Sequence, residues 1–296
     1  MFYNQKEILS KIESNSKKFT DNEIFNFIKN SILYDDLLTL DLLLKNDCFV
    51  YTRNDELSVF EWCVYRQNMK AFEKLNEYKS LKNFKNDNSL NIAVMLNLPI
   101  EIIEYIQESC YNIDVFDKYD MTSVNWALQT KNNEILEYLL KKGANPNLFY
   151  DTCQNNLFFA VADSNFKAVE LLLKYGAEIN PNDNSVPLSI ALYHNNYIIA
   201  DYLISQGANV NLTDENNRTA LFDVAVLSEF SKCEYLIKNG ADITIKDKYG
   251  ITPEMIIKNK ALREFLYNDL HCGLYEEWDE EDAEIDFCNK IKNFIE

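Results

Sequence analysis

A phrase that begins with glycine and alanine recurs four times in the middle of this chain. It reads GANPN at 143–147, GAEIN at 176–180, GANVN at 207–211 and GADIT at 240–244, and its glycines stand 33, 31 and 33 residues apart. A fixed period of this length is typical of stacked helical repeats, in which each unit packs only against its neighbours. The period therefore predicts an elongated array rather than a closed globular core.

Two apolar segments recur with the same period. The segment that ends in each glycine phrase, NNEILEYLLKKGA in the first copy, predicts the same helix in all four copies because its apolar residues stay in register. The other segment carries a small residue at one fixed place, namely Ala127, Ala160, Ala191 and Val224. Neither helix can bury its apolar face alone, so each unit is predicted to comprise a turn, a short helix, a tight turn, a second helix and a loop.

Specific residues are expected to terminate these helices. The glycine that opens each phrase is predicted to end a helix with positive φ, which glycine adopts without steric penalty. Asn132, Asn165 and Asn195 stand between the two helices of their units. They are predicted to take the left-handed conformation there, because asparagine tolerates it best after glycine.

Residues 117–253 resemble the ankyrin-repeat family. The family pattern is a D-x-x-G-x-T-P-L-H-x-A-A turn and inner helix, followed by an outer helix that ends in L-L-x-x-G-A-x-x-N. The unit DKYGITPEM keeps this pattern best, with Gly250 in the turn, Thr252 as the expected helix cap and Pro253 as the expected first helical residue. The departures are Asp120 and Asn217 for the turn glycine, Ser123, Asn156 and Ala220 for the proline, and Asn125, Phe158 and Phe222 for the histidine.

The resemblance implies an all-α ankyrin-repeat solenoid of stacked helix-turn-helix units with capping helices at both ends. We expect an N-terminal capping helix in residues 1–19, about eight repeats in residues 20–268 and an acidic C-terminal cap or tail in residues 269–296. Thr20 and Glu23 form a capping-box signature that predicts a new helix. The repeat at 181–211 is two residues short in its turn, so its finger should be short. The acidic tail is interpreted as a cap, with an arm offered to a partner as the alternative.

The net charge of −18 bears on the partners that such a chain can bind. Residues 267–296 carry ten acidic residues and two lysines. This acidity disfavours nucleic acid and anionic membranes, whereas a basic protein would be steered toward the chain. Maintenance of solubility is the alternative explanation. The chain has no apolar run of transmembrane length, and its first residues interleave charges where a signal peptide needs an apolar centre, so a cytoplasmic location is expected.

Catalytic and metal-binding patterns are weak. His194 and His271 are the two histidines of the chain, and a pair between Cys153 and His194 is geometrically conceivable but has no support in its flanking sequence. The seven cysteines lack the paired spacing of a zinc site and are expected to be reduced, small apolar residues. The glycines are committed to repeat ends, which leaves no phosphate-binding loop. We therefore expect no enzyme activity, no metal and no cofactor.

One segment allows a different interpretation. Residues 98–106, LPIEIIEYI, resemble the start of an F-box, which would make the chain an adaptor of a ubiquitin ligase. The same residues stay in register with NEILEYLL, the outer helix of a later unit. An ordinary outer helix is the favoured prediction.

The family resemblance also implies a binding surface, because the turn fingers and inner-helix ends of ankyrin proteins line a concave face that binds other proteins. Carried over position by position, this face comprises Lys118, Tyr119, Met121, Gln129, Asp151, Thr152, Gln154, Tyr193, His194, Glu215, Asn216, Arg218, Lys248, Tyr249 and Ile251. Tyrosine and arginine are the types that most often anchor interfaces.

The favoured hypothesis is a non-catalytic protein-binding module that is monomeric when free. It would act as a stoichiometric inhibitor or immunity protein that neutralises a basic partner, such as a toxin, through its concave face. The alternatives are a pathogen or viral adaptor that acts on host proteins, of the ubiquitin-ligase type, and a general scaffold.

Overall fold

The computed structural model describes residues 20–45, 57–77, 88–109, 112–148, 155–181, 186–260, 262–264 and 266. The helix expected near the N-terminus, the acidic tail and residues 182–185 of the short finger lie outside these ranges. Within them the regular structure is helical, apart from an isolated bridge between Thr213 and Thr219. No helix in these ranges is long and apolar enough to cross a membrane. The chain divides into two compact units, Met1–Asn145 and Pro146–Glu296.

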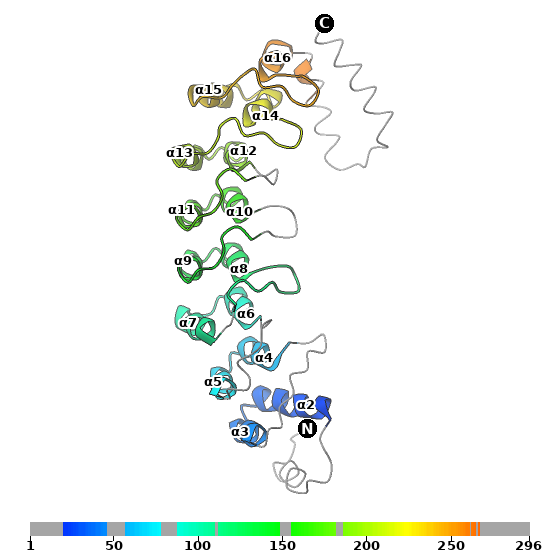
Figure 1. The fold of residues 1–296 in the computed structure, drawn as a ribbon, viewed down its shortest axis with the longest axis vertical. Coiled ribbons are helices and arrows are strands. Elements are labelled where there is room, and N and C mark those ends of the chain that lie inside the picture. Colours follow the sequence, from blue (N-terminus) through cyan, green and yellow to red (C-terminus); the bar gives the residue numbers. More distant parts are fainter. Residues whose placement is uncertain are drawn as a thin grey trace, which may run out of the picture. The chain divides into compact units, whose positions relative to one another are not determined.

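The first unit is a stack of helix pairs (Figure 1). The pairs are α2 (Asp21–Leu33) with α3 (Leu37–Lys45), α4 (Val59–Tyr65) with α5 (Met69–Glu77), α6 (Ser89–Met95) with α7 (Ile100–Ser109), and α8 (Ser123–Gln129) with α9 (Asn133–Lys141). The first helix of each pair, here called the inner helix, packs against the inner helix of the next pair. The second, here called the outer helix, packs against its own inner helix.

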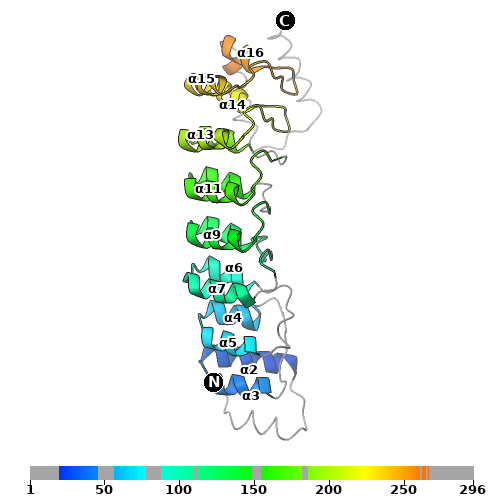
Figure 2. The same cartoon turned by 60° about the vertical axis from the view of Figure 1, so that its left-hand side comes forward.

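The second unit repeats the same arrangement. Its pairs are α10 (Asn156–Ala162) with α11 (Phe166–Lys174), α12 (Pro187–Tyr193) with α13 (Tyr197–Ser205), and α14 (Ala220–Val226) with α15 (Phe230–Lys238), followed by α16 (Pro253–Lys258). The inner helices α10, α12, α14 and α16 pack in that order. Figure 2 shows the outer helices α11, α13 and α15 side by side along one face of the unit. The all-α ankyrin-repeat fold implied by the sequence is confirmed in both units.

The small residues of the inner helices are buried where those helices pack, as their period predicts. Ala127, Ala160, Ala191 and Val224 all lie in the core. A larger side chain at these positions would overpack the core, because protein interiors are close-packed.

The glycine of each phrase ends an outer helix as predicted. Gly176 has φ of 95°, and its N–H donates to the carbonyl of Leu173. The N–H of Ala177 donates to the carbonyl of Leu172 at 2.9 Å, which completes a Schellman motif. A Cβ atom at Gly176 would meet no atom within 4 Å, so the backbone angle, and not lack of space, requires glycine.

The last residue of a phrase connects one repeat to the next. The side chain of Asn147 donates to the carbonyl of Gly176 at 3.0 Å and accepts from the N–H of Glu178 at 2.8 Å. Asn180 and Asn211 make the same two bonds to the following phrases. In the last phrase the residue is Thr244, whose side chain bonds to Asp242 instead. The recurring asparagine thus couples neighbouring repeats through their loops.

The predicted conformations of two turn asparagines are wrong. Asn132 and Asn165 have negative φ and cap the outer helices α9 and α11, where their side chains accept backbone N–H groups of the first turn. The left-handed residues are their predecessors Lys131 and Ser164, with φ of 56° and 55°. A helix start leaves unpaired N–H groups, and an asparagine side chain satisfies them well. Asn195, with φ of 58°, takes the left-handed conformation as predicted.

The helix caps expected from the sequence are confirmed. Thr20 accepts a hydrogen bond from the N–H of Glu23, whose carboxylate accepts from the N–H of Thr20, which is a complete capping box. Thr252 accepts from the N–H of Met255, and Pro253 is the first residue of α16. These caps fix where the first and last described inner helices begin.

Candidate protein-binding surface

Two fingers of the same sequence, DKY, each carry a contacting pair of lysine and tyrosine, in which Tyr119 is exposed and Tyr249 is half-buried. In the finger of the first unit, the carboxylate of Asp117 accepts the N–H of Tyr119 at 2.8 Å, which folds the turn. The ammonium group of Lys118 lies 4.9 Å from the centre of the Tyr119 ring, and both side chains are exposed. Lys248 and Tyr249 repeat this contact at 4.9 Å in the second unit.

The structure corrects two of the predicted surface residues. Met121 and Ile251 are buried and do not contribute to an exposed face. Their carbonyls accept the N–H groups of Asp117 and Asp247, both at 2.9 Å, which closes each finger. The residue after the turn therefore leads the chain back into the array, and its apolar side chain enters the core.

The finger around residue 214 carries three further predicted residues. Glu215 is exposed, and the carbonyl of Asn216 accepts the N–H of Lys248 at 2.9 Å, which ties this finger to the next. The guanidinium group of Arg218 lies 5.2 Å from the centre of the Phe222 ring. Its Nε atom is buried and has no hydrogen-bond partner in the described part of the chain. Arg218 is therefore partly a packing residue against the inner helix α14.

Three further predicted residues, Gln129, Tyr193 and His194, lie at the ends of inner helices and are exposed. Gln129, at the end of α8, is exposed. Tyr193, at the end of α12, is 66% exposed, and its ring contacts that of His194 edge to face at 5.3 Å. Asp151, Thr152, Cys153 and Gln154 lie outside the described residues, so the conceivable pair of Cys153 with His194 stays untested.

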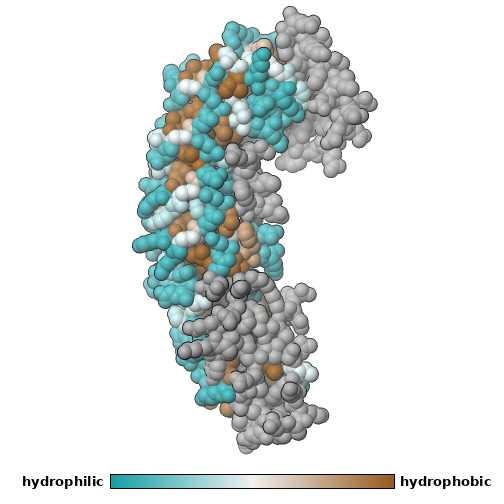
Figure 3. All heavy atoms as spheres, viewed as in Figure 1, coloured by the Kyte–Doolittle hydropathy of each residue, from teal (hydrophilic) through white to brown (hydrophobic). Residues whose placement is uncertain are grey.

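The inner helices of the second unit also have partly exposed apolar side chains. Phe158, Phe159 and Ile190 are half-buried, and the two phenylalanine rings contact each other at 6.1 Å. Figure 3 shows hydrophobic side chains that reach the surface between hydrophilic ones along the stacked helices. Partly exposed apolar and aromatic groups of this kind are typical of the centre of a protein interface.

A cavity of about 180 Å³ lies between α12 and α14 and is here called the α12–α14 cavity. Its lining comprises Ser189, Ile190, Tyr193, Ala220, Asp223, Val224, Leu227, Glu229 and Lys232. The side chain of Lys232 is 4% exposed and pairs with Glu229. The hydroxyl of Ser189 is buried and has no hydrogen-bond partner among the described residues. The cavity thus combines apolar walls with a few buried polar groups, as small-molecule and side-chain binding sites do.

Asp223 is the unusual acid of this cavity. Burial raises its pKa to about 7, with a further contribution from Asp214 and an opposing one from Arg218. The carboxyl group is therefore close to half-protonated at neutral pH. A shifted carboxyl group in a cavity is a frequent mark of a functional site.

Sequence reasoning missed this cavity, although three departures within one repeat point to it. The fourth residue of the inner helices is Trp62, Ile92, Trp126, Phe159 and Ile190 in α4 to α12, whereas α14 has Asp223. The third residue of the outer helices is Thr39, Ala71, Ile135, Ala168 and Ile199 in α3, α5, α9, α11 and α13, all buried, whereas α15 has Lys232. The N-cap residue, which directly precedes the outer helix, is asparagine in α5, α9, α11 and α13. In α15 the N-cap residue is Glu229.

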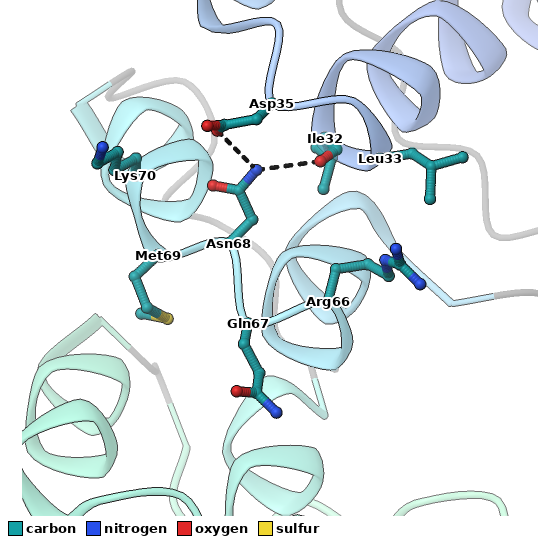
Figure 4. A pocket seen from close by; sticks show the side chains of 8 residues that line it. All are labelled: Ile32, Leu33, Asp35, Arg66, Gln67, Asn68, Met69 and Lys70. Carbon is teal, nitrogen blue, oxygen red and sulfur yellow. Dashed lines mark hydrogen bonds between the residues drawn. The ribbon is translucent and has the colours of Figure 1, made fainter.

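A wider cleft of about 460 Å³ in the first unit lies at the turns between α2 and α3 and between α4 and α5 (Figure 4). The amide of Asn68 donates to Asp35 at 3.2 Å and to the carbonyl of Ile32 at 3.0 Å, and its oxygen accepts the N–H of Ala71. The side chains of Arg66 and Lys70 point away from each other. Because its central polar group already serves to join adjacent repeats, this cleft is a weaker candidate than the α12–α14 cavity.

The described residues offer little for catalysis. No group of three or more metal-ligating side chains comes together in them. Cys63 and Cys233 are buried free thiols, as predicted, and burial raises the pKa of Cys233 to about 11, so its thiolate is scarce at neutral pH. The other cysteines lie outside the described ranges.

The F-box-like segment forms part of an ordinary helix pair. Ile103 and Ile106 are buried in α7, which packs against α6 and α9. Leu98, at the start of the segment, is also buried. The prediction of an outer helix at this position is confirmed.

Comparisons with known proteins agree with this geometry. Residues 157–247 match the family model for ankyrin repeats in three copies. An alignment over 79 positions, which covers 24% of this chain, shows 37% identity to the putative ankyrin repeat protein FPV234 of Fowlpox virus (strain NVSL). The match spans 18% of that viral protein, so the chain covers less than a fifth of its relative's length.

Two solved structures share the fold. One is the ankyrin repeat domain of Bcl-3, a member of the IkappaB protein family, with a TM-score of 0.57, 22% identity, and coverage of 70% of this chain and 96% of that one. The other is an ankyrin repeat domain from Acinetobacter baumannii AYE, with a TM-score of 0.53, 24% identity, and coverage of 61% and 95%. Ankyrin repeats are generally non-catalytic modules that bind other proteins. Residues 157–247 of this chain are therefore ankyrin repeats, and the helix pairs of both units have the ankyrin-repeat fold.

Proposed function

We propose that this protein binds one basic protein and neutralises it stoichiometrically, as an inhibitor or an immunity protein does. The binding face would be the inner-helix face of the second unit, with the neighbouring fingers. The observation that carries the proposal is the exposed ring of Tyr193 beside the half-buried Ile190 and the acidic α12–α14 cavity.

An apolar contact and long-range charge would both contribute to this binding. Tyrosine rings that are exposed in the free protein and enclosed in the complex supply much of the binding energy of protein interfaces. A net charge of −18 raises the rate at which a basic protein meets the chain, and it disfavours acidic competitors. Neither contribution requires a reacting group.

Capture by the purified full chain from a lysate of its own source tests this proposal, with the retained protein then purified and titrated. We expect a single basic protein, bound one to one, whose own activity falls to nothing at the equivalence point. Its affinity should weaken about tenfold or more between low and moderate salt, because screening removes the charge contribution. An acidic protein of similar size serves as the control. Affinity that salt leaves unchanged would refute the electrostatic half, and many unrelated partners would indicate a scaffold.

An adaptor that acts on host proteins is a second candidate, favoured by the match to a poxvirus ankyrin protein. Residues 100–106 of the segment that suggested an F-box lie in α7, with Ile103 and Ile106 buried, so an adaptor would have to recruit its ligase through another segment. The same capture would then retain ubiquitin-ligase components in place of one basic protein.

A further inference from the structure

We propose that the α12–α14 cavity binds one lysine side chain of the partner, whose ammonium group contacts the carboxylate of Asp223 and the hydroxyl of Ser189. The inference rests on the proposed function, since it specifies how a basic partner is held. It assigns a ligand to the cavity whose lining includes the three residues of one repeat that depart from their counterparts, namely Asp223, Glu229 and Lys232.

The size and lining of the cavity suit the stem of a lysine. Its volume is about 180 Å³, and a cavity of about 150 Å³ engineered into another protein holds a benzene molecule. Ile190, Val224 and Leu227 supply apolar wall for the four methylene groups. The ring of Tyr193 lines the same cavity and is 66% exposed, so it can cover the stem or attract the cation.

The polar groups at the cavity favour a donor with several N–H groups. The buried Ser189 hydroxyl oxygen has no hydrogen-bond partner among the residues described, which is unfavourable unless a ligand supplies one. Asp223 offers carboxylate oxygens from the facing helix α14. An ammonium group has three donors and no acceptor, so it can satisfy both acceptors at once.

The charges around the cavity favour a cation over an anion. Lys232 lies on the α15 side and is paired with Glu229, so its charge is already balanced. From α14 the carboxyl group of Asp223 remains, and from the finger Asp214 and Arg218 act on it with opposite signs. An incoming carboxylate or phosphate would therefore face the carboxyl group of Asp223, which no lysine of the lining balances.

Proton linkage gives the site an expected pH dependence. Burial holds the pKa of Asp223 at about 7, and a bound ammonium group would favour the charged carboxylate and lower that pKa. At a pH below about 7, the protonated fraction of Asp223 must therefore lose its proton when a cation binds. Cation affinity should fall as the pH decreases through 7 and should level off above it.

The test uses the full chain with isotope-labelled aspartate, NMR detection of the Asp223 carboxyl carbon, and n-butylammonium as the probe. The neutral control is n-butanol, which has the same stem without the charge. We expect n-butylammonium to shift the Asp223 signal and to lower its titration midpoint, and to bind at least tenfold more tightly than n-butanol. Methylguanidinium should bind more weakly than n-butylammonium. Equal binding of cation and alcohol, or tighter binding of methylguanidinium, would overturn the inference.

Two variants locate the probe, with the ring signals of Tyr193 as the readout. Asp223→Asn is nearly isosteric, and it should reduce n-butylammonium binding to the level of n-butanol. Ser189→Ala should weaken the cation several-fold and leave n-butanol unchanged. Amide spectra that match the parent chain establish that both variants fold. Unchanged cation binding by Asp223→Asn would contradict the assignment.

The probe experiment needs no partner protein, so its outcome is separate from that of the capture experiment. If n-butylammonium does not bind in the cavity, but a basic protein is captured with an affinity that salt weakens, the cavity inference is wrong and the proposed function stands. If the cation binds at Asp223 but no basic protein is retained, the proposed function is wrong.

Discussion

Replacement of Leu172 by alanine is expected to lower the free energy of unfolding by about 2–5 kcal/mol. Leu172 is 0% exposed in α11, and its backbone carbonyl accepts the N–H of Ala177 in the turn that ends this helix. The substitution leaves a cavity between helices that cannot fully close. Because each repeat is stabilised mainly by its neighbours, the loss should also weaken the adjacent repeats.

The adjacent Leu173 provides a matched control. It lies in the same helix and differs in being half-buried. Leu173→Ala removes the same atoms and should cost less than half as much. Urea denaturation followed by circular dichroism measures both variants. Equal losses in the free energy of unfolding would mean that the side of α11 that carries Leu172 is not the side packed into the core.

Removal of Glu229 should destabilise the protein more than removal of its partner Lys232. Glu229→Gln leaves the ammonium group of Lys232 enclosed without a counter-charge, and we expect it to lower the free energy of unfolding by about 1–3 kcal/mol. The loss should be smaller than that of a fully buried pair because the side chain of Glu229 is 37% exposed. Water can therefore solvate Glu229 when it is left alone, but cannot reach Lys232.

Lys232→Met is the matched replacement at the other end of the pair. The same position holds isoleucine or alanine in α9, α11 and α13, so an apolar side chain fits the fold there. The substitution Lys232→Met also removes a positive charge from the first turn of α15, where the helix dipole disfavours positive charge. Stability should stay within about 1 kcal/mol of the parent or rise. A large loss for Lys232→Met, with little for Glu229→Gln, would contradict the burial pattern around this pair.

The repeat fold could be predicted from the sequence because its determinants are local and recur. The period of 33, 31 and 33 residues placed Gly176 at a helix end, and the backbone angle found there requires glycine. The turn asparagines were harder to place, since adjacent positions need a left-handed residue and a helix cap, and asparagine suits both. Asn132 was therefore assigned a conformation that belongs to Lys131.

The binding surface was less predictable because it depends on which side chains point outward after each turn. Met121 has a place in the finger pattern but is buried when the finger closes. The α12–α14 cavity depends on residues of two repeats, and its signal is a departure from the repeat: Asp223 and Lys232 occupy positions that hold apolar residues or threonine in other units. Comparison of equivalent positions within one chain can find such departures without any structure.

The affinity of the captured partner for Tyr193→Ala, compared with Ile198→Ala, tests most directly whether the inner-helix face binds protein. The two side chains are 66% and 72% exposed, but Tyr193 ends the inner helix α12 and Ile198 lies near the start of the outer helix α13. We predict that Tyr193→Ala costs at least about 2 kcal/mol, or roughly 30-fold in Kd, while Ile198→Ala changes Kd less than about threefold. A loss confined to Ile198→Ala would place the partner on the outer helices and contradict the account.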